Sequence, residues 1–134
     1  MAKVVHVSGK RKTAIARATI KEGAGIIRIN KIPLEVYNQE VARMRIREPL
    51  LIAGELASKI NANINVKGGG WHSQAEAARQ ALAKGMVRFF ESKDLEKAFL
   101  DYDRTLLVAD IRRKEPKKFG RHSRARARRQ TSYR

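Results

Sequence analysis

The chain has 134 residues, with 30 Lys and Arg against 13 Asp and Glu, so its formal net charge is +17. It contains no cysteine, which excludes a disulfide framework and a cysteine-ligated zinc site. No apolar run approaches the length of a membrane-spanning helix, and the run at the N-terminus is too short for a signal peptide. We therefore expect a soluble intracellular protein of one domain, long enough to bury a real core.

Short β-branched runs predict the first three strands. Residues 4–8 form a strand that ends at Gly9, and residues 13–22 form a second strand with one face of small residues. That face is expected to lie under a closely packed neighbour. A connection at residues 23–25 then turns the chain into a third strand over residues 26–29.

The middle of the chain mixes turns, helix and one further strand. Residues 30–33 are predicted as a turn, followed by a single helical turn from Leu34 to Tyr37. Residues 41–58 have helical character, and Pro49 fits the first turn of a second helix there. Strict alternation of apolar residues with asparagine and lysine over residues 60–67 predicts a fourth strand with one wet face.

The strongest helical pattern covers residues 73–91. Ser73 and Glu76 have the spacing of a capping box, and an apolar stripe follows. Arg79 is expected on the opposite, outer face, together with Lys84 and Arg88. A short helix over residues 94–101 ends the apolar pattern before Asp110.

This order of elements predicts an α+β fold. A hairpin plus a β-α-β crossover gives a two-layer sandwich, with a four-stranded mixed sheet and helices on one face. We divide the chain into a globular domain, residues 1–111, and a long basic C-terminal arm, residues 112–134.

The arm holds eleven Lys and Arg residues and one acid, Glu115. Such a segment has too little apolar surface to offset the entropy of ordering, so we expect it to be disordered alone in water. A dense polyanion would stabilise it, and nucleic acid is the commonest one. The alternatives are a solvated terminus with no partner, or an anionic membrane surface, which would need an amphipathic helix that the arm lacks.

The body is basic as well, with 19 Lys and Arg against 12 acids in residues 1–111. The loop of Lys10, Arg11 and Lys12 is one basic patch, and three arginines at residues 43, 45 and 47 are another. We expect both patches to belong to one basic surface. We expect the residues between the arginines of the triplet to pack while the arginines meet phosphate.

Three glycines, Gly68 to Gly70, precede the long helix. With Lys67 beside them, they could let the backbone and the helix N-terminus approach a phosphate, although the Walker pattern is absent. A sharp strand-to-helix turn explains the same glycines equally well. We expect Trp71, which follows them, to be a packing anchor rather than a platform for stacked bases.

Catalysis finds little support in the sequence. The three histidines are scattered, no Gly-x-Ser-x-Gly elbow occurs, and the acidic pairs lie on presumed surface helices. We expect no enzyme activity, no cofactor and no metal.

Four segments, in order, resemble the universal small-subunit ribosomal protein nine family. They are the opening Ser8 to Arg17, the turn Ile29 to Pro33, the stretch Asn63 to Gly70 continued by Gln74, Ala75 and Arg79, and the arm from Lys117 to Arg134. The Ser-Tyr-Arg ending and the insert at residues 43–49 look archaeal or eukaryotic rather than bacterial.

The resemblance implies a left-handed β-α-β crossover, an exception to the usual rule. It also implies a cytoplasmic protein in the head of the small ribosomal subunit, bound to ribosomal RNA and to other head proteins. The extreme C-terminus would reach the anticodon stem-loop of the peptidyl-site tRNA. It implies no membrane, no small-molecule substrate and no chemistry of its own.

The expected contacts follow from these arguments. Ribosomal RNA would meet Lys10, Arg11, Lys12, Arg17, Arg43, Arg45, Lys67, Gly68, Gly69, Gly70, Arg79, Arg112, Arg113, Lys117, Lys118, Arg121, Arg124 and Arg126. The tRNA would meet Arg128, Arg129, Tyr133 and Arg134.

Two other functions remain open from the sequence alone. A free-standing protein that compacts DNA or RNA would bind without regard to RNA fold. A phosphate-handling enzyme would use the glycines at 68–70 and would bind nucleotides as an isolated domain.

Overall fold

The computed structural model describes residues 2–37, 39–129 and 132–133. These residues form five strands: β1 (Val4–Arg11), β2 (Ala14–Glu22), β3 (Ile27–Ile29), β4 (Ile32–Pro33) and β5 (Ile60–Lys67). They also form three α-helices: α1 (Glu40–Ala53), α2 (Trp71–Phe90) and α3 (Lys93–Tyr102). Three 3-10 turns join them: η1 (Leu34–Val36), η2 (Gly54–Lys59) and η3 (Arg104–Leu106).

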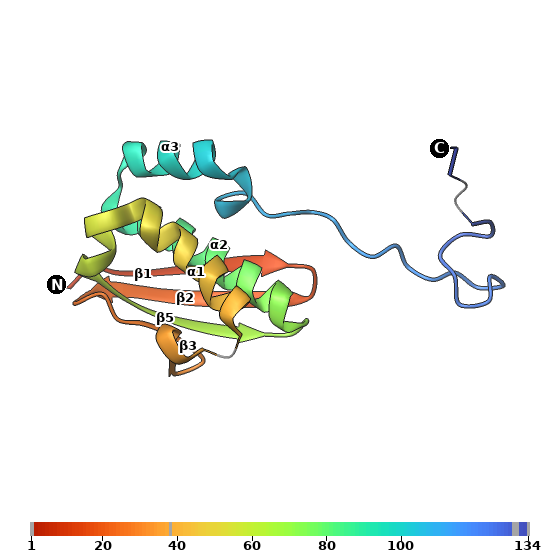
Figure 1. The fold of residues 1–134 in the computed structure, drawn as a ribbon, viewed down its shortest axis with the longest axis horizontal. Helices are drawn as coiled ribbons and strands as arrows, with labels where there is room; N and C mark the ends of the chain where they lie inside the picture. The colour runs from red at the N-terminus through yellow and green to blue at the C-terminus, as the bar shows by residue number, and fades with distance from the viewer. Residues whose placement is uncertain (1, 38, 130–131, 134) are drawn as a thin grey trace.

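The strands make one mixed sheet in the order β1-β2-β5-β3-β4 (Figure 1). β2 pairs antiparallel with both β1 and β5, whereas β3 runs parallel to β5. The chain between these parallel neighbours passes through α1, as the sequence predicts for a β-α-β crossover. The α+β class is thereby confirmed, and the left-handedness of the crossover stays a prediction.

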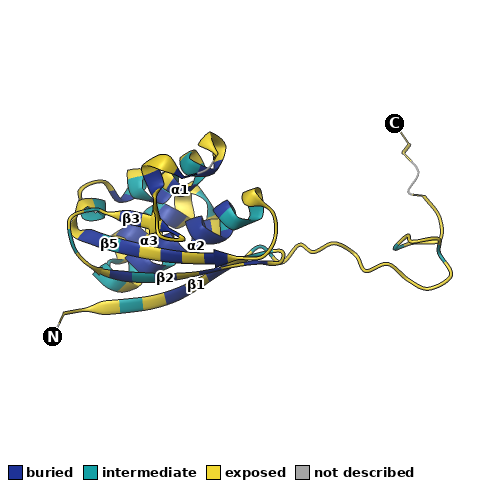
Figure 2. Ribbon diagram, turned by 90° about the horizontal axis from the view of Figure 1, so that it is seen from below, coloured by how far each residue is buried: buried dark blue, intermediate teal, exposed yellow. Residues whose placement is uncertain are grey.

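The helices cover one face of the sheet, and the strands are banded in buried and exposed residues (Figure 2). The small face of β2 packs against α2, where Ala77, Ala78 and Ala81 are fully buried. Gly9 in β1 lets the helix come this close, because a Cβ atom there would lie 2.7 Å from the backbone nitrogen of Ala81. The expectation of a closely packed neighbour is confirmed.

The sheet has one strand more than the sequence predicts. Residues 30–33 were expected as a turn, but Ile32 and Pro33 form β4, which pairs with β3 at the edge of the sheet. An edge position tolerates proline, because the missing N–H does not break a central ladder. Two residues are too few to show a period of two, so the sequence pattern contains no signal for this strand.

Two helix boundaries also differ from the prediction. α1 is continuous from residue 40 to residue 53 and Pro49 lies inside it, not in the first turn of a second helix. The ring is fully buried, and this packing offsets the one helical hydrogen bond that proline cannot donate. α2 begins at Trp71 with Gly70 as its N-cap, so Ser73 and Glu76 do not form a capping box.

The other helical predictions are confirmed in place. The single turn after Pro33 is η1, and α3 covers the expected short helix at residues 94–101. α3 contacts α1 and α2. Beyond residue 110 the described part of the chain has no regular helix or strand and runs away from the body (Figure 1). Its described residues are exposed apart from the half-buried Arg121 and Ala125.

Candidate nucleic-acid interface

The tip of the β1–β2 hairpin presents the first basic cluster. Lys10 and Lys12 are exposed there, and Lys12 has a φ of +54°, in the left-handed region of a tight turn. The backbone N–H of Lys10 donates a 2.9 Å hydrogen bond to Gln80 of α2, which fixes the hairpin on the helix. Two ammonium groups are therefore held at the end of a rigid element.

Asp110 joins the hairpin tip to the root of the arm. Its carboxylate lies 3.5 Å from the guanidinium of Arg11 and 2.8 Å from that of Arg112. Hydrogen bonds from the side chain and backbone of Arg112 hold the pKa of Asp110 well below its usual range. The backbones of Arg11 and Asp110 also form an isolated parallel bridge. These contacts fix where the arm leaves the body.

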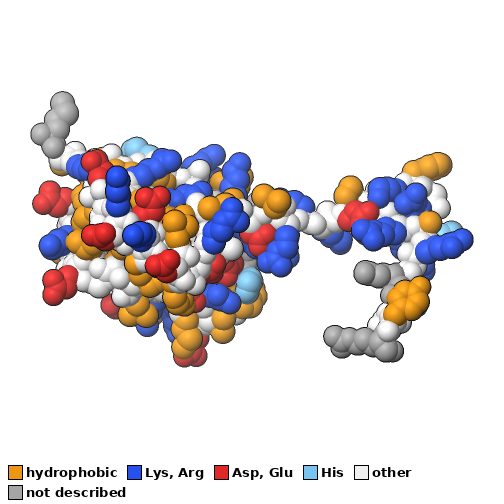
Figure 3. Space-filling view, turned by 90° about the horizontal axis from the view of Figure 1, so that it is seen from above, with side chains coloured by type: hydrophobic (Ala, Val, Ile, Leu, Met, Phe, Trp, Pro, Cys, Tyr) orange, Lys and Arg blue, Asp and Glu red, His pale blue; other side chains and the backbone are white. Residues whose placement is uncertain are grey.

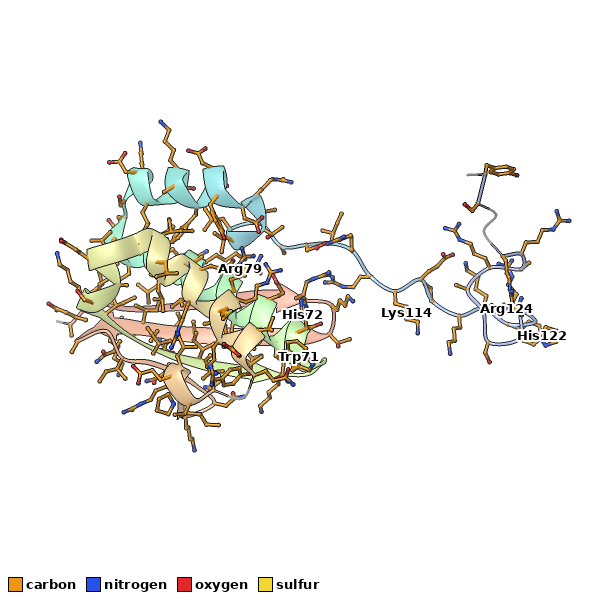
Figure 4. The ribbon with its side chains drawn as sticks, viewed as in Figure 1. Trp71, His72, Arg79, Lys114, His122 and Arg124 are labelled. Carbon is orange, nitrogen blue, oxygen red and sulfur yellow. The ribbon has the colours of Figure 1, made fainter. Side chains whose placement is uncertain are left out.

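A hollow of about 290 Å³ lies beside this junction. Hairpin, helices and arm root all contribute charged or polar side chains to its wall, among them Arg45, His72, Glu76 and Thr105. In Figure 4, His72 lies near the arm root, whereas Lys114, His122 and Arg124 lie out along the arm.

Arg79 is buried, which corrects the expectation that it lies on the outer face of its helix. Its side chain is 3% exposed and pairs with Glu48 at 2.6 Å, Asp103 at 2.9 Å and Glu76 at 3.5 Å. Burial alone would lower the pKa of Arg79, but the hydrogen bond to Asp103 and the three carboxylate charges outweigh it and raise the pKa. Arg79 has no surface to offer RNA, so we leave it out of the interface.

The arginines of α1 are partly engaged within the protein. Arg45 pairs with Glu48 at 3.6 Å and with Glu76 at 3.7 Å, and Arg43 donates to the carbonyl of Tyr37 at 3.3 Å. Both side chains are half-buried. Of the two residues expected to pack between the arginines, Ile46 is fully buried but Met44 is 57% exposed, because alternate residues do not share a face on a helix. Arg43 and Arg45 are therefore weaker phosphate sites than their sequence predicts, whereas Arg47 is exposed.

The glycine turn has a structural requirement of its own. Gly68 and Gly69 have φ of +80° and +66°, and a Cβ on Gly68 would lie 2.6 Å from the carbonyl oxygen of Thr13. Gly70 differs, because its φ is −89° and no atom lies within 4 Å of an added Cβ. The turn explains two of the glycines, and the third leaves room for a ligand at the start of α2.

Trp71 does not anchor the core. Its side chain is 42% exposed, and its ring meets His72 edge-on with centroids 5.6 Å apart. The expectation of a packing anchor is wrong, because Trp71 is exposed and does not belong to the buried core.

Three further cations lie on the face of the sheet that the described helices leave open. Arg17 was expected in the interface, whereas Lys21 and Arg28 were missed. The sequence contains a signal that places all three on this face, because each alternates with residues of its strand that are buried.

The arm holds eleven Lys and Arg residues, more than any of the clusters described so far (Figure 3). Its one acid, Glu115, pairs with Lys118 and Arg126, each at 2.9 Å, and these hydrogen bonds lower the pKa of the Glu115 carboxyl. Arg134 lies outside the described residues. The other predicted arm residues are exposed apart from the half-buried Arg121: Arg112, Arg113, Lys117, Lys118, Arg124, Arg126, Arg128, Arg129 and Tyr133.

These cations converge on one end of the body, which we call the basic end: Lys10, Arg11, Lys12, Lys67 and Arg112. The nearby carboxylates of Glu76, Asp103 and Asp110 are all ion-paired. β2 and α2 both run from this end to the far end, where acids such as Glu22 and Glu91 mix with lysines. The surplus positive charge of the molecule is concentrated at the basic end and along the arm.

Comparison with known proteins identifies the family. The model of the family described as Ribosomal protein S9/S16 matches residues 9–134. The chain belongs to this family. Small ribosomal subunit protein uS9 of Methanococcus maripaludis is 56% identical over 98% of this chain and 99% of its own length. The proteins of the same name from Desulfurococcus amylolyticus and Methanothrix thermoacetophila are 53% and 52% identical over 98% of this chain, covering 94% and 99% of their own lengths.

The family expected from the sequence is thus confirmed, and archaeal proteins are among the matching relatives. Its proteins are structural constituents of the ribosome and not enzymes. No helix in the described part of the chain is both long enough and apolar enough to span a membrane.

Proposed function

We propose that this protein is a structural constituent of the small ribosomal subunit, in the cytoplasm, and binds ribosomal RNA in the subunit head. One observation carries the proposal: the surplus cations converge on the basic end and the arm, in a chain 56% identical to a small-subunit protein. Carboxylates near the basic end are already paired, so they leave the exposed ammonium and guanidinium groups available for phosphate. Other head proteins are the remaining expected partners.

The contacts with ribosomal RNA have two parts. The rigid part comprises Lys10, Lys12, Lys67 and the open start of α2 at Gly70, all held by the sheet and its connections. Amide N–H groups at a helix N-terminus favour anions, which suits a backbone phosphate beside Gly70. The second part is the arm, in which arginine predominates over lysine, as suits bidentate phosphate contacts and stacking inside folded RNA.

The end of the arm is proposed to reach the anticodon stem-loop of the peptidyl-site tRNA. Its reach permits this, because the 17 residues from Lys118 to Arg134 span at most roughly 56–61 Å at about 3.3–3.6 Å per residue. Arg128, Arg129, Tyr133 and Arg134 would make the tRNA contact. A body outside the decoding region can then still place one guanidinium at the tRNA.

Sedimentation tests the main proposal. The tagged chain should migrate with small subunits on a sucrose gradient and should stay there after a wash in moderate salt. Migration with bulk RNA or DNA instead would favour the free compacting protein. Nucleotide binding by the purified chain would favour the enzyme.

A two-residue deletion tests the tRNA contact. Small subunits that carry the chain without Tyr133 and Arg134 should form in normal yield and release peptidyl-site tRNA faster. One charge-assisted hydrogen bond is worth about 1.5–3 kcal/mol, less at a wet site, so the increase should stay below roughly a hundredfold. An unchanged off-rate with reduced yield would assign the terminus to assembly.

A further inference from the structure

The face of the sheet opposite the helices carries a polar surface that extends well beyond the basic end, with which it shares only Lys10 and Lys67. None of the described elements covers it (Figure 2). We call it the open face, and the described strand residues on it include no Asp or Glu: Val4, His6, Ser8, Lys10, Ile15, Arg17, Thr19, Lys21, Arg28, Asn61, Asn63, Asn65 and Lys67.

Strand register aligns these side chains in rows. Ser8, Arg17 and Asn65 lie directly opposite one another on β1, β2 and β5. The next row, about 7 Å along the strands, holds His6, Thr19 and Asn63, and continues to Arg28 on β3. Hydroxyl, amide and imidazole groups therefore occupy the middle of the face, with a guanidinium in each row.

Several of these groups have no partner within the described residues. The side-chain amides of Asn63 and Asn65 make no hydrogen bond there, and Arg17 makes no ion pair. Asn61 is different, because its carbonyl oxygen accepts hydrogen bonds from the backbones of Ala24 and Ile26 and serves the fold. Donors and acceptors at the centre of the face are thus available to a ligand.

The surface beside Arg17 is hollowed on two sides. One hollow of about 280 Å³ extends toward Lys67 and Gly68, and another of about 450 Å³ extends toward His6 and Arg88. Arg17 and Asn65 line both hollows, so they form the ridge between them. Each hollow has a second cation on its wall, Lys67 in one and Arg88 in the other.

We propose that the open face binds the minor groove of an RNA duplex, an inference that rests on the proposed function and names the RNA feature bound. The minor groove of A-form RNA is wide and shallow and displays 2′-hydroxyl groups, which the side-chain amides of Asn63 and Asn65 can meet with both donors and acceptors. Arg17 and the cations around it would take the flanking phosphates.

Other occupants fit this surface less well. Single-stranded RNA is usually held by aromatic platforms on a sheet, and no Phe, Tyr or Trp lies on the described open face. A protein partner would be expected to meet an apolar centre with few charges, whereas Arg17 and Asn65 occupy the centre here.

Directed cleavage of RNA tests the proposal. Because the natural chain has no cysteine, Asn65→Cys creates a single site for a tethered iron chelate, and Lys97→Cys, at an exposed position of α3, is the matched control. In reconstituted small subunits, the iron chelate at position 65 should cut both strands of one duplex at least several-fold more strongly than the chelate at position 97. The cuts on the two strands should be offset across the minor groove. Cuts confined to unpaired RNA, or none above the control, would overturn the proposal.

A coupling measurement adds a second readout. Asn65→Leu should weaken binding to small-subunit ribosomal RNA about fivefold, the contribution of one net hydrogen bond. Replacing the 2′-hydroxyls at the cleaved sites by hydrogen should weaken the natural chain similarly but leave the variant unchanged. Additive losses would overturn the proposal. If the natural chain itself fails to sediment with small subunits, the proposed function fails; if it sediments and the open face gives no cuts, only this inference fails.

Discussion

At the scale of single residues, Arg79 separates the two tasks that basic residues perform in this protein. Exposed cations such as Lys10 and Lys12 face solvent, whereas Arg79 neutralises carboxylates from α1, from its own helix and from the segment after α3. Its three partners are far apart in sequence. The charge network therefore joins the helical layer rather than preparing a surface for RNA.

Replacing Arg79 by methionine should cost about 3–5 kcal/mol in the free energy of unfolding, because the three carboxylates would lose their shared cation in a buried site. Arg17 is exposed and pairs with no carboxylate within the described residues. Arg17→Met should therefore change the free energy of unfolding by no more than about 0.5 kcal/mol. Urea unfolding followed by circular dichroism measures both. A small loss of stability at Arg79 combined with weaker RNA binding would return this residue to the interface.

Asp103 makes the same network sensitive to acid. Burial alone would raise its pKa, but hydrogen bonds from Thr105 and Arg79 outweigh burial and lower the pKa. In the unfolded chain the pKa returns to about 3.9, so below that pH the unfolded state takes up a proton that the folded state refuses. Stability should therefore fall as the pH drops below about 4. Melting temperatures of the natural chain and Asp103→Asn should converge there; parallel curves would contradict the assignment.

At the scale of elements, the predictable part of the fold is the part with an unbroken period. β2, β5 and the apolar stripe of α2 follow from alternation and helical spacing alone. β4 could not be predicted, because it exists only through pairing with β3. The start of α2 was misplaced, since Gly70 caps it without a side-chain signature, whereas Ser73 and Glu76 imitate a cap.

The candidate site likewise has a part that the sequence predicts and a part that it does not. Net charge and the basic arm are properties of the sequence and could be predicted from it. The burial of Arg79 could not, because its partners Glu48 and Asp103 are brought to α2 by packing of distant segments. The cations of the open face, including Lys21 and Arg28, had a signal in their alternation with core residues.

The start of α2 offers a matched test of the phosphate contact. Gly70→Asp and Gly70→Asn both supply good N-caps at a position with room for a side chain, so both should fold at least as stably as the natural chain. Only the aspartate would repel a phosphate. Like charges about 4 Å apart repel by about 1 kcal/mol in water and more at a protein surface, so its RNA affinity should be roughly tenfold weaker than that of the asparagine variant. Equal affinities, measured by filter binding, would favour a turn with no RNA contact.

At the scale of the whole molecule, the arm supplies most of the surplus charge and almost none of the core. Residues 111–120 are all exposed, and the core lies between the sheet and its helices. The body should therefore fold without the arm, and the arm should act chiefly through counterion release from RNA.

Removing residues 118–134 should leave the fold intact and reduce the salt dependence of RNA binding. Each neutralised phosphate contributes a slope of about −0.9 for duplex and about −0.7 for single strands in log K against log salt. Six engaged arm cations would thus contribute a slope of at least roughly 4 in magnitude, and truncation should remove most of it. A slope that survives truncation would place the main electrostatic contact on the body.

The junction at Asp110 has a consequence for the order of events during association. Because Arg11 and Arg112 tie the arm root to the hairpin tip, the arm always leaves the body beside the basic end and never beside the mixed far end. A polyanion that first binds the arm is therefore held close to the rigid cations of the basic end, and it contacts them next. Non-productive orientations are thus reduced from the first encounter, and the gain appears as a faster association rate at low ionic strength, not as a slower dissociation.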